Sequence, residues 1–266
     1  MRAAKPSSKI LAPFVETLWS SEGQGVLGRQ ILLPDGRMQL LVDLSGAGLR
    51  DFDLDGSPRH RIASGVALQG PRTRPIIIDA SPQRMACGVS FFPGGATPFF
   101  SVPAHELVDR LVDLREIWGR DARSLSERLA EESTAEARLK ALESALLKKF
   151  RPLSDNHRRA SLVISGLQEH RSIGAIEEEL GMHARGFIAW FRCHVGPRPK
   201  HYARLARFQE LLSMWEDQTN WGGRAAAAGF ADQAHMNREF KHFAGITPTE
   251  YRPMAGAAYN HLDLSA

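Results

Sequence analysis

The sequence predicts an α+β protein, with a small N-terminal β-barrel or sandwich, flanking helices, and an all-α C-terminal domain. Three observations lead to this prediction. Apolar runs broken by Gly, Pro and Asp fill the first part of the chain and are typical of strands and turns. Amphipathic helical periods follow them. A pattern of Phe, Gly, Pro and Tyr then occurs twice at identical spacing, which indicates an internal repeat. At 266 residues, the chain has room for two domains with their own cores.

The strands are predicted from two long stretches, GRQILLPDGRMQLLVDLSG and RPIIIDASPQRMACGVSFFPGG. Between them, DFDLDGSPRHRIASG predicts a hairpin with Gly56 in its loop. In the second stretch apolar residues alternate, as in a strand that turns one face to a core. These residues are Met85, Cys87, Val89 and Phe91. We expect a small barrel or sandwich over about residues 20 to 95.

Two amphipathic helices are predicted after the strands. PAHELVDRLVDLREIWG carries one apolar stripe, and STAEARLKALESALLKKF carries another after a capping box of Ser133 and Glu136. The second helix packs on the barrel or against the same helix of a second subunit in a homodimer, and the sequence does not distinguish these arrangements. The stripes are Leu107, Leu111, Leu114 and Trp118, and Leu139, Leu142, Leu146 and Phe150. We divide the chain into a domain at 1–150, a polar linker at 151–160 and a second domain at 161–266.

The repeat in the second half follows the pattern F-x4-G-x2-P-x2-Y. The Phe anchors a core, the Gly ends a helix in the left-handed conformation, and the Pro suits the first turn of the next helix. In the second copy, Thr247 and Glu250 predict a capped start for that next helix. The copies are Phe191, Gly196, Pro199 and Tyr202, and Phe240, Gly245, Pro248 and Tyr251.

Each copy follows a shorter helix and a turn that contains glycine. SIGAIEEELG precedes the first copy, and AAAAGF ends a helix at Gly229 before the second. The helix after Gly229 buries Met236, Phe240 and Phe243, which have helical spacing. This order is that of a helix-turn-helix, so two units are predicted in tandem. A helix over about residues 200 to 215 joins them.

Positive charge is concentrated around the first unit. Between Met182 and Phe208 the chain has several Arg and Lys residues and no acidic residue. Such a stretch beside a recognition helix favours contact with nucleic-acid phosphates, although a solvated basic face is the alternative. The residues predicted to contact phosphates are Arg192, Lys200 and Arg204, with Lys241 in the second unit.

The two units resemble the DNA-binding domain of AraC/XylS-type transcription regulators, above all in GFADQAHMNREF and GITPTEYR, over about residues 161 to 252. The N-terminal half, with LLPDG and FFPGGATPFF, is similar to the cupin-like sensory domains fused to such DNA-binding domains. The resemblance implies a sequence-specific regulator of double-stranded DNA with a small-molecule effector. It implies base contacts at Gln233, Ala234, His235, Asn237 and Arg238, and at Arg185, Ile188, Ala189 and Arg192 in the first unit.

The first unit departs from the family pattern. The family usually has a polar residue at position 189, an alanine at 177 and a Ser or Thr cap at 183, where this chain has Ala189, Glu177 and His183. Ile188 and Ala189 offer a base only apolar contact. We therefore expect specificity to rest mainly on the second unit.

Composition argues against several other functions. The two cysteines, Cys87 and Cys193, are too few for a Cys-rich zinc site and fit free thiols in a reducing cytoplasm. The N-terminal half offers only His60 and His105 to a cupin-type metal site, so we expect neither metal nor cofactor. No catalytic triad spacing or phosphate loop stands out. A signal peptide and a membrane-spanning stretch are not expected either, which favours a cytoplasmic location.

We interpret the sequence as a one-component transcription regulator without enzymatic activity. The rival interpretation is an interaction protein that does not bind DNA and uses its helical domain as a partner surface. An enzyme built on the β domain comes third. Trp19, Arg37 and Phe91 are candidates for lining a ligand pocket, although each fits ordinary core or surface better.

Overall fold

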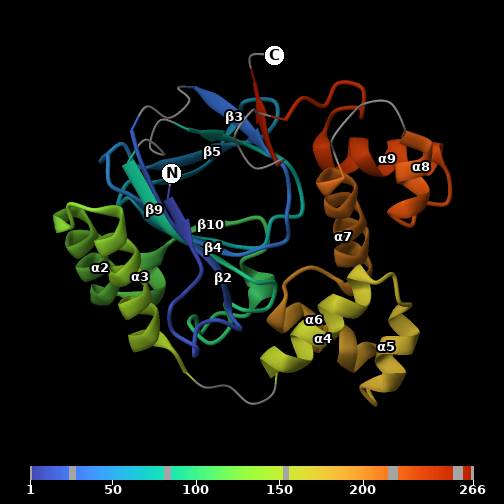
Figure 1. Ribbon diagram of the computed structural model, residues 1–266, viewed down its shortest axis with the longest axis horizontal. Helices are drawn as coiled ribbons and strands as arrows, with labels where there is room; N and C mark the ends of the chain where they lie inside the picture. The colour runs from blue at the N-terminus through green and yellow to red at the C-terminus, as the bar shows by residue number, and fades with distance from the viewer. Residues whose placement is uncertain are drawn as a thin grey trace.

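The N-terminal half of the protein forms two antiparallel sheets, and the C-terminal half forms a helical domain beside them (Figure 1). The computed structural model describes residues 2–23, 28–80, 85–151, 156–214, 221–253 and 260–264. Within these ranges, no helix has the length and apolar character needed to cross a membrane. The predicted α+β class is confirmed.

The larger sheet carries most of the N-terminal core. Its order is β1 (Arg2–Ala4), β2 (Val15–Glu22), β9 (Met85–Phe91), β4 (Gln39–Asp43), β7 (Val66–Gln69) and β10 (Leu111–Asp113). β9 is central and pairs with β2 on one side and β4 on the other. Cys87, Val89 and Phe91 are fully buried there, as the alternating pattern predicted, whereas Met85 at the strand end is exposed.

The second sheet contains the predicted hairpin and a strand from the far end of the chain. Its order is β11 (His261–Asp263), β3 (Arg29–Leu32), β8 (Ile76–Asp79), β5 (Leu49–Phe52) and β6 (Pro58–Ile62). β5 and β6 pair as a hairpin, and Gly56 adopts a φ of +85° in its loop. Because β11 pairs with β3, the tail that follows the helical domain becomes part of the N-terminal domain.

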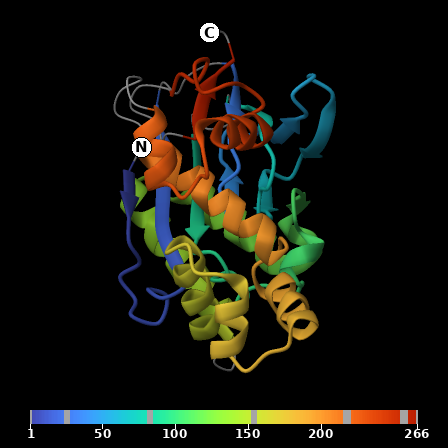
Figure 2. The ribbon, with the colours of Figure 1, turned by 90° about the vertical axis from the view of Figure 1, so that its right-hand side faces the viewer.

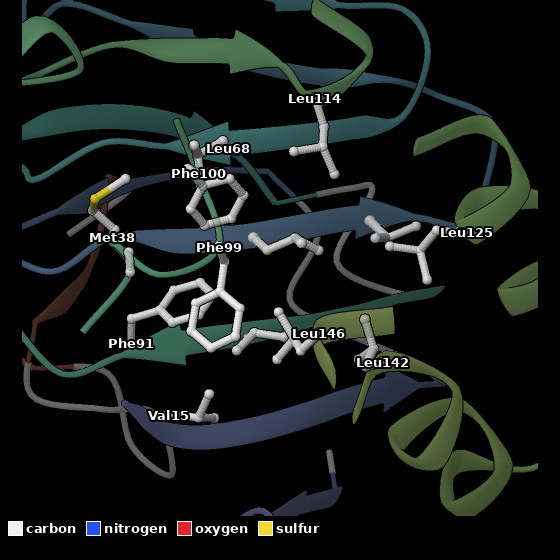
Figure 3. Close-up of a cluster of buried hydrophobic side chains, with 14 of the residues drawn as sticks. Val15, Met38, Leu68, Phe91, Phe99, Phe100, Leu114, Leu125, Leu142 and Leu146 are labelled. Atoms are coloured by element: carbon white, nitrogen blue, oxygen red, sulfur yellow. The ribbon is translucent and has the colours of Figure 1, made fainter. Parts of the chain in front are cut away.

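Helices cover one side of the larger sheet, away from the helical domain (Figure 1). They are α1 (Leu114–Trp118), α2 (Arg120–Glu131) and α3 (Ala135–Lys149). α3 packs on β2 and β9, so its apolar stripe is buried within the chain. In this core, Phe91, Phe99 and Phe100 lie with Leu142 and Leu146 of α3 (Figure 3).

The prediction of one continuous helix over residues 103–119, the first of the two expected after the strands, is wrong. Its segment contains a 3-10 turn, η2 (Ala104–Glu106), followed by β10 and the short α1. Asp109 has a φ of +57°, which breaks the helical path, and Asp113 caps α1 by accepting a hydrogen bond from the Arg115 amide. The leucines of the stripe are buried, but Leu107 follows η2, Leu111 lies in β10 and Leu114 begins α1. Their spacing therefore fits burial without a continuous helix.

The cap of α3 also differs from the prediction. Thr134, and not Ser133, accepts a hydrogen bond from the amide of Ala137, at 3.2 Å. Ser133 and Glu136 therefore do not form the predicted capping box. The helix itself begins within two residues of the predicted start, because the leucine stripe fixes its buried face.

In the described part of the C-terminal domain there are six helices, and α7 runs between its two units (Figure 2). They are α4 (Asn156–Gln168), α5 (Ile173–Glu179), α6 (Ala184–His194), α7 (Pro199–Ser213), α8 (Trp221–Ala227) and α9 (Gln233–Ala244). α4 starts at Asn156, inside the stretch predicted as a linker. α7 corresponds to the predicted connecting helix, whose last expected residue lies outside the described residues.

No helix begins at Pro248, contrary to the prediction. The amide and hydroxyl of Thr247 both donate to Oε2 of Glu250, each at 2.7 Å, so the predicted pair does form. Residues 248–250 nevertheless make only a turn, and Pro253 forms a bridge to Leu262 of β11. The chain is thus directed back to the N-terminal sheet in place of a helix.

The glycines of both repeat copies lie where the helical domain meets the N-terminal domain. A Cβ atom on Gly196 would lie 2.8 Å from the side chain of Pro71, and one on Gly245 would lie 2.6 Å from Leu54. Gly245 also ends α9 in the left-handed conformation, with a φ of +76°. Glycine at these positions therefore allows both units to approach the sheets closely.

Candidate DNA-binding surface and ligand cavity

α5 and α6 form the first helix-turn-helix unit. The hydroxyl of Ser172 caps α5 by accepting from the amide of Ala175, at 3.2 Å, and Gly181 turns the chain with a φ of +62°. His183 caps α6, because its Nδ1 accepts a hydrogen bond from the amide of Gly186 at 2.9 Å. The imidazole thus takes the place of the Ser or Thr hydroxyl that usually satisfies a helix start.

α8 and α9 form the second unit. Gly229, with a φ of +71°, follows α8, and Asp232 caps α9 by accepting from the amide of His235 at 2.6 Å. Phe240 and Phe243 are fully buried against α7, as the helical spacing predicted. Both units therefore have an anchored second helix with a defined start.

The residues predicted to contact bases lie on the open faces of α6 and α9. In α9, His235 is half-buried, and in α6, Ile188 is 39% exposed. The other predicted base-contacting residues are all exposed: Gln233, Ala234, Asn237 and Arg238 on α9, and Arg185 and Ala189 on α6. Their spacing places each set on one side of its helix. The contacts to bases remain a prediction.

The residues predicted to contact phosphates differ in their surroundings. Lys200 at the start of α7 and Lys241 on α9 are exposed, and Arg192 is half-buried. Arg204 donates from Nε and Nη2 to the carboxylate of Glu239, at 2.7 and 2.9 Å. We therefore assign Arg204 a positioning role, because its guanidinium fastens α9 to α7.

The ion pair between α7 and α9 is partly shielded from water. Burial alone would raise the pKa of Glu239, but the hydrogen bonds and charge of Arg204 lower it overall. The carboxylate therefore stays ionised and keeps its bidentate partner, which is the strong form of this contact. α9 is held by this pair as well as by its aromatic core.

A cavity of about 420 Å³ lies between the two N-terminal sheets. Trp19 and Arg37 line it, whereas Phe91, the third predicted candidate, lies in the core on the other side of its sheet. Arg72 also lines it and is 2% exposed. Its Nη2 lies 3.0 Å from Asp35, but its Nε has no hydrogen-bond partner among the described residues. The apolar lining includes Leu32, Leu41, Val42, Ile76, Ile78 and Leu111.

One wall of the cavity comes from the C-terminal half. Gln209 of α7 and Asn260 and His261 of the tail line it. Burial lowers the pKa of His261 to about 4, and the charge of Arg72 adds to this effect. The imidazole is therefore neutral at ordinary pH, and its Nδ1 lies 3.0 Å from Oε1 of Gln30.

Sequence reasoning missed Arg72, His261 and the cap formed by His183. Arg72 stands between Gly70-Pro71 and Pro75 in a stretch that reads as a turn, and nothing in that stretch marks a buried cation. His183 carried a signal, because it occupies the position of a cap, but imidazole is an uncommon residue there. Among the described residues, no cluster of three or more His, Cys, Asp or Glu side chains could hold a metal ion.

Two tandem helix-turn-helix units with exposed recognition faces define a DNA-binding protein. Comparison with known families gives two matches. Residues 176–254 match the family described as helix-turn-helix domain, and residues 4–113 match a domain of unknown function, DUF6597. No curated protein matches the sequence.

Among solved structures, the chain is similar to ToxT from Vibrio cholerae. One ToxT structure is 14% identical, with a TM-score of 0.46, and the match covers 88% of this chain and 96% of ToxT. A structure of ToxT bound to an unsaturated fatty acid is also 14% identical, with a TM-score of 0.44 and coverage of 88% and 92%.

The C-terminal part of our chain is an AraC-type helix-turn-helix domain, and the chain is a DNA-binding transcription regulator of that type.

Proposed function

We propose that both units bind one DNA duplex and that α9 supplies most of the sequence specificity. The observation that carries this proposal is the exposure of Gln233, Asn237 and Arg238 on a helix whose opposite face is buried. These side chains can pair with base edges in a major groove. Arg192 and Lys200 would hold phosphates and set the register.

The geometry of α7 supports simultaneous binding. Its 15 residues span about 22 Å, and successive major grooves lie roughly 34 Å apart. Recognition helices attached near the two ends of α7 can reach both grooves if the DNA bends or the units tilt. We propose that the regulator acts in the cytoplasm, where it meets such DNA.

We further propose that the cavity in the N-terminal domain binds a small-molecule effector. An effector with an apolar body would fit the aliphatic lining. An oxygen acceptor on it would satisfy Nε of Arg72, which has no hydrogen-bond partner within the described part of the chain. A screen of such compounds for increases in the melting temperature tests this idea. Compounds that act in the cavity should lose their effect in Leu41→Trp, where an indole fills the space.

Selection of bound fragments from random duplex DNA tests the main proposal and yields the operator. The affinity should then be measured against salt. With roughly five phosphate contacts, log affinity should fall with log salt at a slope of about −4 to −5. A salt-independent interaction, or no binding at low salt, would contradict the proposal and favour the rival protein-interaction role.

A further inference from the structure

β11 presents successive side chains to two different parts of the molecule. His261 lines the cavity beside Gln30. Leu262 is 3% exposed and belongs to the core of the second helix-turn-helix unit, with Phe240 and Tyr251. Because neighbouring side chains of a strand point to opposite faces, β11 is shared by the cavity wall and that core.

Backbone contacts hold β11 between these two parts. Leu262 lies opposite Ile31 of β3, and the amide of Leu33 donates to the carbonyl of Asn260 at 2.8 Å. Leu262 also forms a bridge with Pro253, just after the second unit. Ile31 and Leu33 pack in the same core as Leu262. Movement of β11 must therefore disturb β3 and the second unit together.

Among the strands that the structure describes, none joins the first unit to the N-terminal domain in this way. Thr97 donates to the carbonyl of His194 at 3.3 Å, and Gly196 approaches Pro71. None of the described residues of α5 or α6 lines the cavity. Gln209 of α7 lines the cavity, but α7 is common to both units. A signal through α7 would therefore reach both units and would not be selective for one of them.

We propose that β11 couples the cavity selectively to the second helix-turn-helix unit. An occupant that contacts His261 keeps β11 on β3, and the docked strand keeps α9 in its DNA-binding orientation. Gln233, Asn237 and Arg238 of α9 are exposed while β11 is docked, so docking does not block DNA. Docking restricts the motion of α9 before DNA binds, so α9 loses less conformational entropy when DNA binds. By reciprocity, DNA on α9 strengthens binding in the cavity. This inference rests on the function proposed above.

Hydrogen exchange in the full chain tests the coupling without any ligand. Leu262→Ala acts on the core face of β11, and His261→Ala acts on the cavity face. Both should make amides of β3 and α9 exchange at least about tenfold faster while amides of α6 keep their rates. Leu264→Ala, at a position that is 41% exposed, is the matched control and should change nothing. Faster exchange in β3 with unchanged α9 would overturn the proposal.

A probe then tests the cavity end of the coupling. 1-Anilinonaphthalene-8-sulfonate has an apolar body and acceptor oxygens, and Leu41→Trp identifies the part of its binding that occurs in the cavity. Cavity binding should slow exchange in α9 of the unaltered chain and should lose this effect in Leu262→Ala. Cavity binding without any effect on α9 would refute the coupling. If the probe does not bind, the proposed ligand site is called into question, and the two variants still decide the role of β11.

Discussion

At the scale of single residues, arginines of the helical domain have different surroundings. Arg238 is exposed on α9, Arg192 is half-buried on α6, and Arg204 is bound to Glu239. A free guanidinium on a recognition face can pair with guanine, one beside the helix can hold a phosphate, and a paired one positions a helix.

We expect Arg238→Ala and Arg192→Ala to weaken DNA binding in different ways. Loss of Arg238 should cost about 1–3 kcal/mol on the selected site and relax the choice at one base pair. Loss of Arg192 should weaken binding to all DNA sequences alike and reduce the slope of log affinity against log salt by roughly one unit. Affinities on a selected and a scrambled duplex distinguish these outcomes.

The matched variant Arg185→Ala tests the division between the units. It lies at the exposed start of α6, and we expect little loss of discrimination from it. Arg185→Ala could instead abolish discrimination between the selected and the scrambled duplex while Arg238→Ala weakens binding to both equally. That result would mean that α6 reads the sequence, and our assignment would be reversed.

The two thiols should differ sharply in reactivity. Cys87 is fully buried, and burial raises the pKa of its thiol to about 12, whereas Cys193 is only partly buried. Since the thiolate is the reactive form, iodoacetamide at pH 8 should modify Cys193 well before Cys87. Mass spectrometry of the native protein measures this, and equal rates for the two would contradict the buried position of Cys87.

At the scale of the element, α6 depends on an unusual cap. His183→Ala should lower the free energy of unfolding by about 1 kcal/mol, because the amide of Gly186 loses its acceptor. His183→Ser should restore most of that loss, since a hydroxyl accepts equally well at this position. Urea unfolding of the three proteins provides the comparison. An alanine variant as stable as the parent would mean that the cap contributes nothing.

Elements whose pattern is local could be predicted from the sequence. The recognition helices follow from stripes such as Met236, Phe240 and Phe243, which lie within two helical turns, and from glycines that end them. The open faces of the same helices give the candidate base contacts. The cavity could not be predicted, because burial of Arg72 depends on Asp35 and on two sheets that meet only in the fold.

Elements whose existence depends on distant partners were misjudged or missed. The leucines from Leu107 to Leu114 suit a helix, yet Leu111 pairs with Gln69 and so belongs to a strand. HLDLS has no strand pattern strong enough to predict β11. That strand exists because the edge of β3 offers unpaired backbone groups and the second unit offers Leu262 a core.

At the scale of the whole molecule, acid should destabilise the folded protein through His261, which lies in the strand that joins the two halves. The pKa of His261 is about 4 in the folded protein and ordinarily 6.5, so the unfolded chain binds the proton more readily. Stability is therefore lost as the pH falls from about 7 towards 4. At pH 5 the loss from this residue should be on the order of 2 kcal/mol relative to pH 8.

The variant His261→Gln isolates this effect from the other titrating groups. Glutamine keeps a polar side chain beside Gln30 but cannot gain a charge. Unfolding free energies at pH 8 and pH 5 should fall less in this variant than in the parent. Equal losses in both proteins would show that His261 does not contribute to acid sensitivity.

The position of β11 also sets an order in time. Gln30 and His261 meet across β3 and β11 although 231 positions separate them along the chain. At about 5–20 residues per second, the ribosome needs roughly 10 to 50 seconds to travel between them. Throughout that interval one edge of β3 lacks its partner, and an open edge can accept a strand from any neighbouring chain. The first domain to be synthesised is therefore completed only after the DNA-binding domain has emerged.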